Sequence, residues 1–308
     1  GSGEQHAQMI WRSKHVAGPY EPWSGNPSLT QRDLDPARAN PITSTGHAQF
    51  VELKDGTWWA VFLATRPYRG NQYNLGRETF LLPVTWRDGW PVVLARSENV
   101  PAVEERPALP RSPQPVPTSG PIGWTERFTA VKLPPQWMAI HPPKNAWFHT
   151  GADGLKLTPS PAPLGEQDSG RQPAYVAHRL QHHRATISTT LNPYQPAPGE
   201  LVGLALLQNE RYHYVVGLEG DKNGAAVALY RRAGKDQPIT GQRLARIDLP
   251  SSKQVVSLRF QLDGPRLDVF YAVAPGQWKP LATDLDASLL STDVAGGFIG
   301  ATLGPYAR

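Results

Sequence analysis

The chain has 308 residues, a formal net charge of +5 and no cysteine, which excludes disulfide bonds and thiolate metal sites. Its length allows one large domain or two, and an apolar content of 39% is typical of a globular protein. Lys and Arg are scattered, and no apolar run is long enough to span a bilayer, so we expect no nucleic-acid and no membrane partner. No signal peptide is visible, and the composition fits a cytoplasmic protein, although we favour a periplasmic or extracellular one.

Two similar stretches lie in the first third of the chain. Residues 47–63, HAQFVELKDGTWWAVFL, are two apolar runs joined at Asp55-Gly56, which predicts a β-hairpin. Residues 79–94 repeat this design around Asp88-Gly89, and a Trp follows each Gly closely. Repeated hairpins at this spacing suggest blades of a β-propeller, and a plain antiparallel meander explains the same pattern.

The composition changes after the second hairpin. Residues 101–121 hold seven prolines and no periodic apolar pattern, which is typical of an extended connector between domains. Many short apolar strands follow, without helical periodicity, and Asn223-Gly224 and Asp263-Gly264 mark hairpin turns among them. The predicted fold is therefore all-β, with a first domain at 1–103, a Pro-rich linker at 104–123 and a two-sheet, jelly-roll-like sandwich at 124–308.

The loop between the two hairpins has an unusual density of planar donors and aromatic rings. Within twelve residues it carries Arg66, Tyr68, Arg69, Asn71, Tyr73 and Arg77. Arg77 is the strongest candidate for a binding residue, because Gly76 permits a close approach and a guanidinium offers a rigid fork of donors to vicinal hydroxyls or a carboxylate. The alternative is an ion pair between Arg77 and Glu78 that holds the loop to the next strand.

Several histidines are candidates for chemistry. His178, His182 and His183 lie close in YVAHRLQHHRATI, but strand alternation sends the last two to opposite faces, so a metal site is not expected there. His213 alternates with aromatic neighbours and is expected on a strand surface or in the core. His47 opens a strand, where a side chain can point along the strand axis into a cavity. No Gly-x-Ser-x-Gly motif, phosphate-binding glycine loop or fixed carboxylate pair is present.

The order of several motifs resembles glycoside hydrolase family 43. TGHAQFVELKDGTWWAVFLATRPY followed by NLGRETFLLPVTWRDGWPVV is similar to the last two blades of the family's five-bladed β-propeller. The earlier GPYE and NPSLT segments are similar to the family's preceding stretch. LVGLALLQNERYHYVVGLEG and AGGFIGATLGPYA resemble the concanavalin-A-like β-sandwich of its β-xylosidase branch. The resemblance thus implies the C-terminal blades of a propeller followed by a sandwich.

The resemblance also implies an activity and a site. The expected reaction is hydrolysis of terminal β-D-xylosyl or α-L-arabinofuranosyl residues of xylan-derived oligosaccharides with inversion, and the loop donors and rings would contact the sugar. Arg77 matches the family's substrate-binding arginine, and Phe298 matches an aromatic residue that narrows the pocket. His47 matches a central histidine at the substrate, which often reaches a calcium ion at the propeller axis, so calcium is the implied cofactor.

Two departures from the family pattern affect this prediction. Gln49 stands where the family often has Asp. Both catalytic aspartates belong to earlier blades that this sequence does not contain, the general acid Glu would fall shortly before Gly1, and Glu4 has the wrong spacing. The catalytic acids are therefore expected outside this chain, on N-terminal blades supplied by a missing segment or a second chain. The alternative is a non-catalytic carbohydrate-binding protein.

Overall fold

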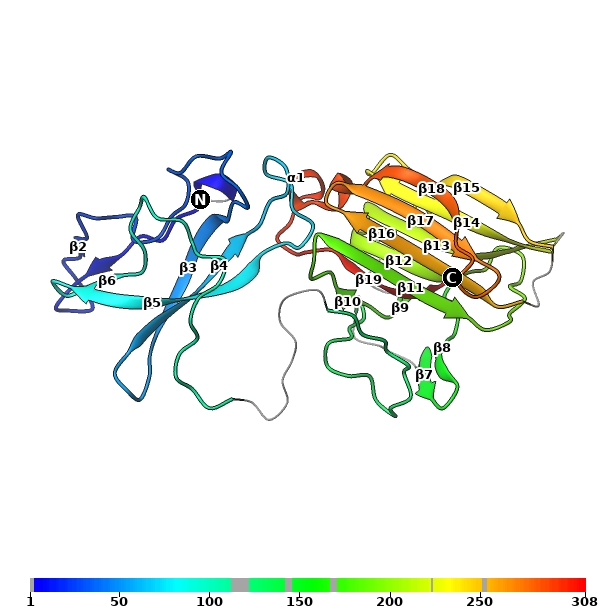
Figure 1. Cartoon of the computed structure of the whole chain (residues 1–308), viewed down its shortest axis with the longest axis horizontal. Coiled ribbons are helices and arrows are strands. Elements are labelled where there is room, and N and C mark those ends of the chain that lie inside the picture. Colours follow the sequence, from blue (N-terminus) through cyan, green and yellow to red (C-terminus); the bar gives the residue numbers. More distant parts are fainter. Residues whose placement is uncertain (1–2, 112–121, 142–145, 167–170, 223, 251–253) are drawn as a thin grey trace. The chain divides into compact units, whose positions relative to one another are not determined.

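The chain forms two compact units in a computed structural model that describes residues 3–111, 122–141, 146–166, 171–222, 224–250 and 254–308 (Figure 1). The first unit contains Gly1–Ala64 and Thr79–Thr129, and the second contains Thr65–Glu78 and Ala130–Arg308. The loop Thr65–Glu78, which was expected in the first domain, therefore belongs to the second unit. Residues 112–121 of the predicted linker lie outside the described part of the chain.

Nearly all regular structure in the described residues is β. The first unit contains η1 (Gly3–Gln5), β1 (Trp11–Arg12), β2 (Glu21–Pro22), β3 (Thr43–Glu52), β4 (Trp58–Thr65), β5 (Glu78–Arg87) and β6 (Trp90–Val92). The second contains β7 (Phe148–Gly151), β8 (Gly154–Leu157), β9 (Ala174–Tyr175), β10 (His178–Arg179), β11 (Arg184–Leu191), β12 (Leu201–Asn209), β13 (Tyr212–Asp221), β14 (Gly224–Ala233), β15 (Gln242–Asp248), β16 (Val256–Asp263), β17 (Arg266–Ala272), β18 (Lys279–Asp286), η2 (Ala287–Leu290), α1 (Thr292–Ala295) and β19 (Thr302–Ala307). No helix in the described part is long and apolar enough to cross a membrane.

The first unit is built on a four-stranded sheet in the order β3-β4-β5-β6. The two predicted hairpins are neighbours in this one sheet, so together they have the size of a single propeller blade, and the expectation of one blade for each was wrong. The turn between β5 and β6 is Asp88-Gly89, and both residues have positive φ, as a tight two-residue hairpin turn requires. Phe62 and Leu82 lie in the core on one face of the sheet.

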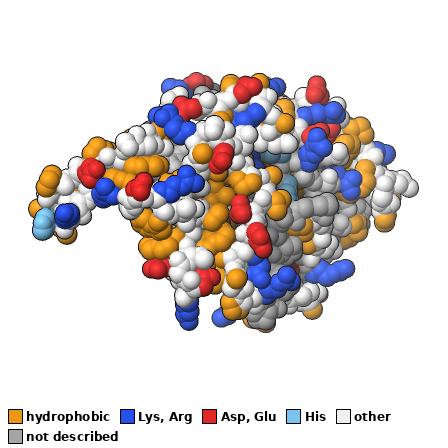
Figure 2. All heavy atoms as spheres, turned by 60° about the vertical axis from the view of Figure 1, so that its left-hand side comes forward, with side chains coloured by type: hydrophobic (Ala, Val, Ile, Leu, Met, Phe, Trp, Pro, Cys, Tyr) orange, Lys and Arg blue, Asp and Glu red, His pale blue; other side chains and the backbone are white. Residues whose placement is uncertain are grey.

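The opposite face of this sheet is apolar and exposed. Strand alternation places Val51, Val61 and Leu81 on the side that does not carry the core residues, and these side chains are 43%, 38% and 37% exposed. Figure 2 shows hydrophobic side chains gathered on the face that this view brings forward. Exposed apolar residues grouped on one face of a sheet are typical of a face that packs against another element.

The second unit is a sandwich of two sheets. One sheet has the order β10-β19-β12-β13-β14-β15, with β9 also paired to β19, and the other has the order β11-β16-β17-β18 (Figure 1). Side chains such as Leu206, Val216 and Phe260 fill the space between the sheets. A second cluster, which includes Leu164 and Tyr175, covers the other face of the larger sheet. Both faces of β12, β13 and β14 are thus buried, which explains why their sequences are almost continuously apolar.

The all-β prediction with a two-sheet sandwich is confirmed. The predicted turn at Asp263-Gly264 joins β16 to β17, and Gly264 has a φ of 55°. Gly224 begins β14, whereas Asn223 of the other predicted turn lies outside the described residues.

We predict that Phe260→Ala lowers the free energy of unfolding by about 3–5 kcal/mol, because it leaves a cavity between the two sheets. Phe260 is fully buried on β16. Thr186→Ala is the control, since Thr186 is exposed on the neighbouring strand β11 and its replacement is expected to cost less than about 0.5 kcal/mol. Chemical denaturation of both variants measures the difference, and equal losses would contradict the assignment of Phe260 to the core.

Candidate functional site

The loop Thr65–Glu78 is tied to the sandwich by three hydrogen bonds near its C-terminal end. The backbone N–H of Tyr73 donates to Oγ of Ser291 at 2.9 Å, and Nδ2 of Asn74 donates to the carbonyl of Ala287 at 3.1 Å. The backbone N–H of Ala301 donates to the carbonyl of Asn74 at 2.8 Å. Asn74 is 2% exposed, so its amide is satisfied inside the protein rather than by solvent.

Two glycines allow the loop backbone to touch the backbone that leads into β19. Gly76 has a φ of 69°, and a Cβ at this position would lie 2.2 Å from the backbone N of Gly300. A Cβ at Gly300 would in turn lie 2.1 Å from the carbonyl oxygen of Leu75. The close approach lets the Leu75 side chain enter the core between the two sheets, where it is 6% exposed. The loop is therefore part of the sandwich packing.

The N-terminal end of the loop is held by a histidine. Nε2 of His183, just before β11, donates to the carbonyl of Arg66 at 2.7 Å. The Tyr68 ring meets the His183 ring edge-on at a centroid distance of 5.3 Å, and the Tyr68 hydroxyl donates to Oδ1 of Asn74 at 3.0 Å. Burial lowers the pKa of His183, because desolvation penalises the charged imidazolium. The sequence pattern raised His183 only as a metal ligand and did not predict its role in holding the loop.

Glu78 forms the expected ion pair with a different arginine. Its carboxylate accepts from Nε and Nη2 of Arg66 at 2.8 and 2.6 Å, a bidentate geometry. The alternative that paired Glu78 with Arg77 was therefore wrong in its partner. Arg69 bonds within the loop, to Oε1 of Gln72. Many of the donors in the loop thus hold the loop itself in place. This use differs from the sugar contacts that the resemblance implies.

Arg77 and Phe298 are brought together. Both are exposed, Phe298 at 62%, and Cζ of Arg77 lies 4.0 Å from the centre of the Phe298 ring. Phe298 follows α1 in the segment that leads to β19. A guanidinium over an aromatic face is attractive by about 0.5–1 kcal/mol at an exposed site. The pair presents an exposed cation stacked on an aromatic ring, a combination that suits a polyhydroxylated ligand.

His47 lies in the first unit, inside β3 (Thr43–Glu52), so the expectation that it opens a strand was wrong. Its side chain is exposed and its φ is 57°, a left-handed conformation that is costly for a residue with a side chain. His6 supports this part of β3: its Nδ1 lies 2.8 Å from the carbonyl oxygen of Ser44, and a Cβ at Gly46 would lie 2.8 Å from its ring. His6 was not predicted as a site residue, since no local pattern links it to a strand forty residues away.

A calcium ion needs roughly six to eight oxygen ligands. No group of three or more His, Asp or Glu that could hold a metal ion occurs in the described residues, and Gln49, two residues after His47, offers a neutral amide in place of a carboxylate. The side chain of Glu4 lies outside the described part. The described residues therefore do not form a calcium site by themselves, and calcium beside His47 stays a prediction that requires further ligands.

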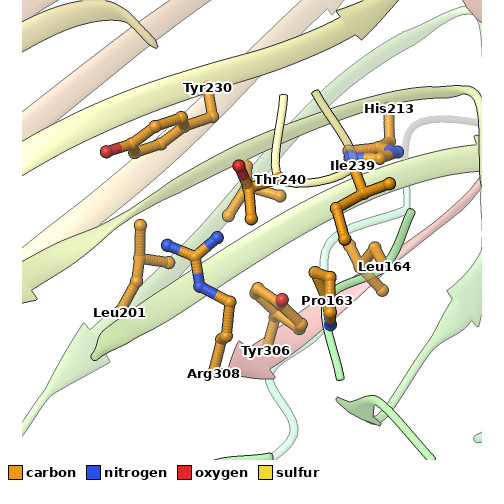
Figure 3. Close-up of a pocket in the computed structure, with 10 residues that line it drawn as sticks. Pro163, Leu164, Leu201, His213, Tyr230, Ile239, Thr240, Tyr306 and Arg308 are labelled. Carbon is orange, nitrogen blue, oxygen red and sulfur yellow. The ribbon is translucent and has the colours of Figure 1, made fainter. Parts of the chain in front are cut away.

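A small cavity in the second unit is lined by His213, Tyr230, Tyr306 and Arg308, among others (Figure 3). It offers ≈10 Å³ to the centre of a water molecule, which is about enough for one water. His213 is 1% exposed, and burial lowers its pKa to about 4, so the ring is neutral near pH 7. His213 is thus a core residue, and this cavity is too small for a sugar ring.

Two family models match the chain. Residues 125–308 match the β-xylosidase C-terminal concanavalin A-like domain, and residues 1–91 match the glycosyl hydrolases family 43 domain. Together they cover both the four-stranded sheet and the sandwich.

Known proteins are similar over the whole chain. The non-reducing end α-L-arabinofuranosidase BoGH43B of Bacteroides ovatus is 31% identical over 100% of this chain and 55% of that protein. A xylosidase/arabinosidase of Butyrivibrio fibrisolvens is 29% identical over 100% of this chain and 57% of that protein. The crystal structure of the GH43 BlXynB protein from Bacillus licheniformis superposes with a TM-score of 0.83 at 26% identity, over 100% of this chain and 57% of the other. The chain thus spans little more than half the length of these relatives.

We predict that acid weakens the hold of His183 on the loop. The folded-state pKa of His183 lies below its ordinary value, so as the pH falls below about 6.5 the unfolded chain takes up the proton first and unfolding becomes more favourable. Burial is the largest influence on this pKa. The hydrogen bond to the carbonyl of Arg66 and the charge of Glu78 favour protonation, whereas the charges of Arg66 and His182 oppose it. His183→Gln keeps an amide donor and removes this titration. The stability advantage of the unmodified chain over His183→Gln should shrink between pH 7.5 and 5 in denaturation experiments.

Parallel pH profiles for the two proteins would contradict this prediction. The comparison is matched because His213, which also titrates in acid, is present in both.

Proposed function

Because this chain belongs to glycoside hydrolase family 43, we propose that it is the C-terminal part of a glycosidase that removes terminal β-D-xylosyl or α-L-arabinofuranosyl residues from xylan-derived oligosaccharides. The contact between Arg77 and Phe298 is the observation that carries the proposal. A guanidinium can donate to two neighbouring sugar hydroxyls, and an aromatic ring can close a pocket around a terminal sugar. Both groups are exposed, and the backbone of Arg77 is fixed by the attached loop.

The proposed reaction proceeds with inversion and needs two carboxyl groups. A protonated acid donates its proton to the leaving oxygen while a carboxylate activates water across the ring, at a separation of roughly 6.5–9.5 Å. We place both groups outside this chain, on N-terminal propeller blades. Arg77 would hold the sugar between them, and His47 would lie beside the substrate. The chain's span of 55% of the Bacteroides ovatus enzyme fits this division.

The apolar face of the four-stranded sheet supports a partner for the first unit. Val51, Val61 and Leu81 on this face are more than one third exposed. Neighbouring propeller blades bury such faces against one another. We therefore propose that the missing blades, on the same polypeptide or on a second chain, cover this surface.

The rival function, non-catalytic carbohydrate binding, requires a row of exposed aromatic rings on one sheet face. Trp137, Trp147 and Trp278 lie outside the strands of the described residues. Trp147 is buried, and the guanidinium of Arg259 lies 3.7 Å from the centre of the Trp278 ring. These rings do not offer a continuous stacking surface, so we prefer the glycosidase.

We predict that Arg77→Ala lowers kcat/KM about ten- to hundredfold, since a hydrogen bond from a charged group contributes about 1.5–3 kcal/mol. The assay uses the complete polypeptide or complex that contains this chain, with 4-nitrophenyl β-D-xyloside and α-L-arabinofuranoside. Arg69→Ala is the matched control, because Arg69 is an exposed arginine of the same loop that bonds to Gln72. If both variants retain the original kcat/KM on both glycosides, Arg77 does not contact the substrate.

The stereochemistry gives an independent prediction. Inversion releases α-xylose first from a β-xyloside, because water attacks from the side opposite the leaving group. Proton NMR of the earliest product distinguishes the two anomers before mutarotation. Release of the β anomer would exclude the inverting mechanism.

A further inference from the structure

Asn74 connects three parts of the second unit through its side chain and its backbone carbonyl. It donates to the carbonyl of Ala287 in η2 and accepts from the hydroxyl of Tyr68 at the other end of the loop. Its backbone carbonyl accepts from Ala301, next to β19. An asparagine that is 2% exposed and has these partners fixes the course of the loop.

Arg77 follows this anchor after only two residues, and neither is free to move. Leu75 is buried in the sandwich core, and Gly76 lies in backbone contact with Gly300. The guanidinium of Arg77 is exposed and rests on Phe298, a ring that is itself mostly exposed. Such an open contact restrains a long side chain weakly, so the place of Arg77 depends mainly on the backbone before it.

We propose that Asn74 is a positioning residue for Arg77, through which the sandwich sets where the guanidinium meets the substrate. The inference rests on the proposed function, in which Arg77 holds a sugar. Asn74 is buried and touches no ligand in this scheme, so its effect on turnover passes through Arg77. A displacement of a binding group by about 1 Å can cost up to about a hundredfold in rate.

A double-mutant cycle separates positioning from general stability. Asn74→Ala is expected to lower kcat/KM about tenfold. If Arg77→Ala acts mainly on kcat, Asn74→Ala should do the same, and likewise for KM. In the Arg77→Ala background, Asn74→Ala should change kcat/KM by less than about twofold, because the group it positions is gone. An equal loss in both backgrounds would show a merely structural role and would overturn the proposal.

Gln72→Ala is the matched control for this cycle. It removes an amide of similar size from the same loop, but the bond it breaks, to Arg69, lies within the loop. Its kcat/KM should stay within about twofold of the unmodified enzyme in both backgrounds. A loss equal to that of Asn74→Ala would show that any change in the loop is sufficient, and would also overturn the proposal.

Hydrogen exchange provides a readout that does not depend on activity. In Asn74→Ala, the amides of residues 66–77 and of Ala301 should exchange faster, while those of β16 and β17 keep their rates. Unchanged exchange in residues 66–77 would overturn the anchoring role, whatever the activity. Suppose that exchange is faster in Asn74→Ala but that Arg77→Ala keeps the original kcat/KM. This result would refute the proposed function of Arg77 and, with it, the positioning of a substrate contact.

Discussion

The contact between Gly76 and Gly300 is the constraint on which the candidate site depends. A side chain on either residue would meet backbone atoms at little more than 2 Å, so the two segments approach this closely only because both lack one. Once they touch, Leu75 reaches the core between the sheets and Asn74 reaches η2. Arg77 then leaves the sandwich beside Phe298. The position of one exposed cation thus follows from close packing of the backbone next to it.

The polar groups of the loop are satisfied in a way that makes this packing possible. Burying part of a loop removes its backbone from water, and each lost partner must be replaced. The carbonyl of Arg66 accepts a hydrogen bond from Nε2 of His183, and the backbone N–H of Tyr73 donates one to Oγ of Ser291. The guanidinium of Arg66 is neutralised by Glu78. Most of the donors and rings in this loop therefore serve to attach it to the sandwich, and only a few are left to contact a ligand.

Local patterns predicted the elements of this fold because those patterns arise from neighbours in the chain. Alternation of apolar residues, Asp-Gly turns and the proline-rich segment placed the strands and the two-sheet sandwich. They did not show that both early hairpins share one sheet, which depends on pairing between strands. Nor did they show that Thr65–Glu78 belongs to the sandwich. The bond between Tyr73 and Ser291 spans 218 residues, and no local spacing reports such a distance.

The candidate site likewise contains residues that the sequence predicted and residues that only the folded structure shows. Arg77 and Phe298 were predicted through resemblance to a family, and the structure places them in contact. The groups that hold the loop, Asn74 and His183, carry no motif, since any polar residue of suitable shape could serve. His47 was predicted to open a strand but lies inside β3, and the support that β3 receives from His6 at Ser44 depends on the folded backbone.

Leu75 makes the sandwich dependent on a separate stretch of the chain. Its side chain fills space in the core of a unit whose other described strands begin some seventy residues later in the chain. A sandwich transferred by gene recombination without this loop would lack the Leu75 side chain in its core and the backbone contact at Gly300. Exchange of this sandwich between proteins therefore has to move two separated stretches of DNA together, so we expect the sandwich and the four-stranded sheet to have been inherited together.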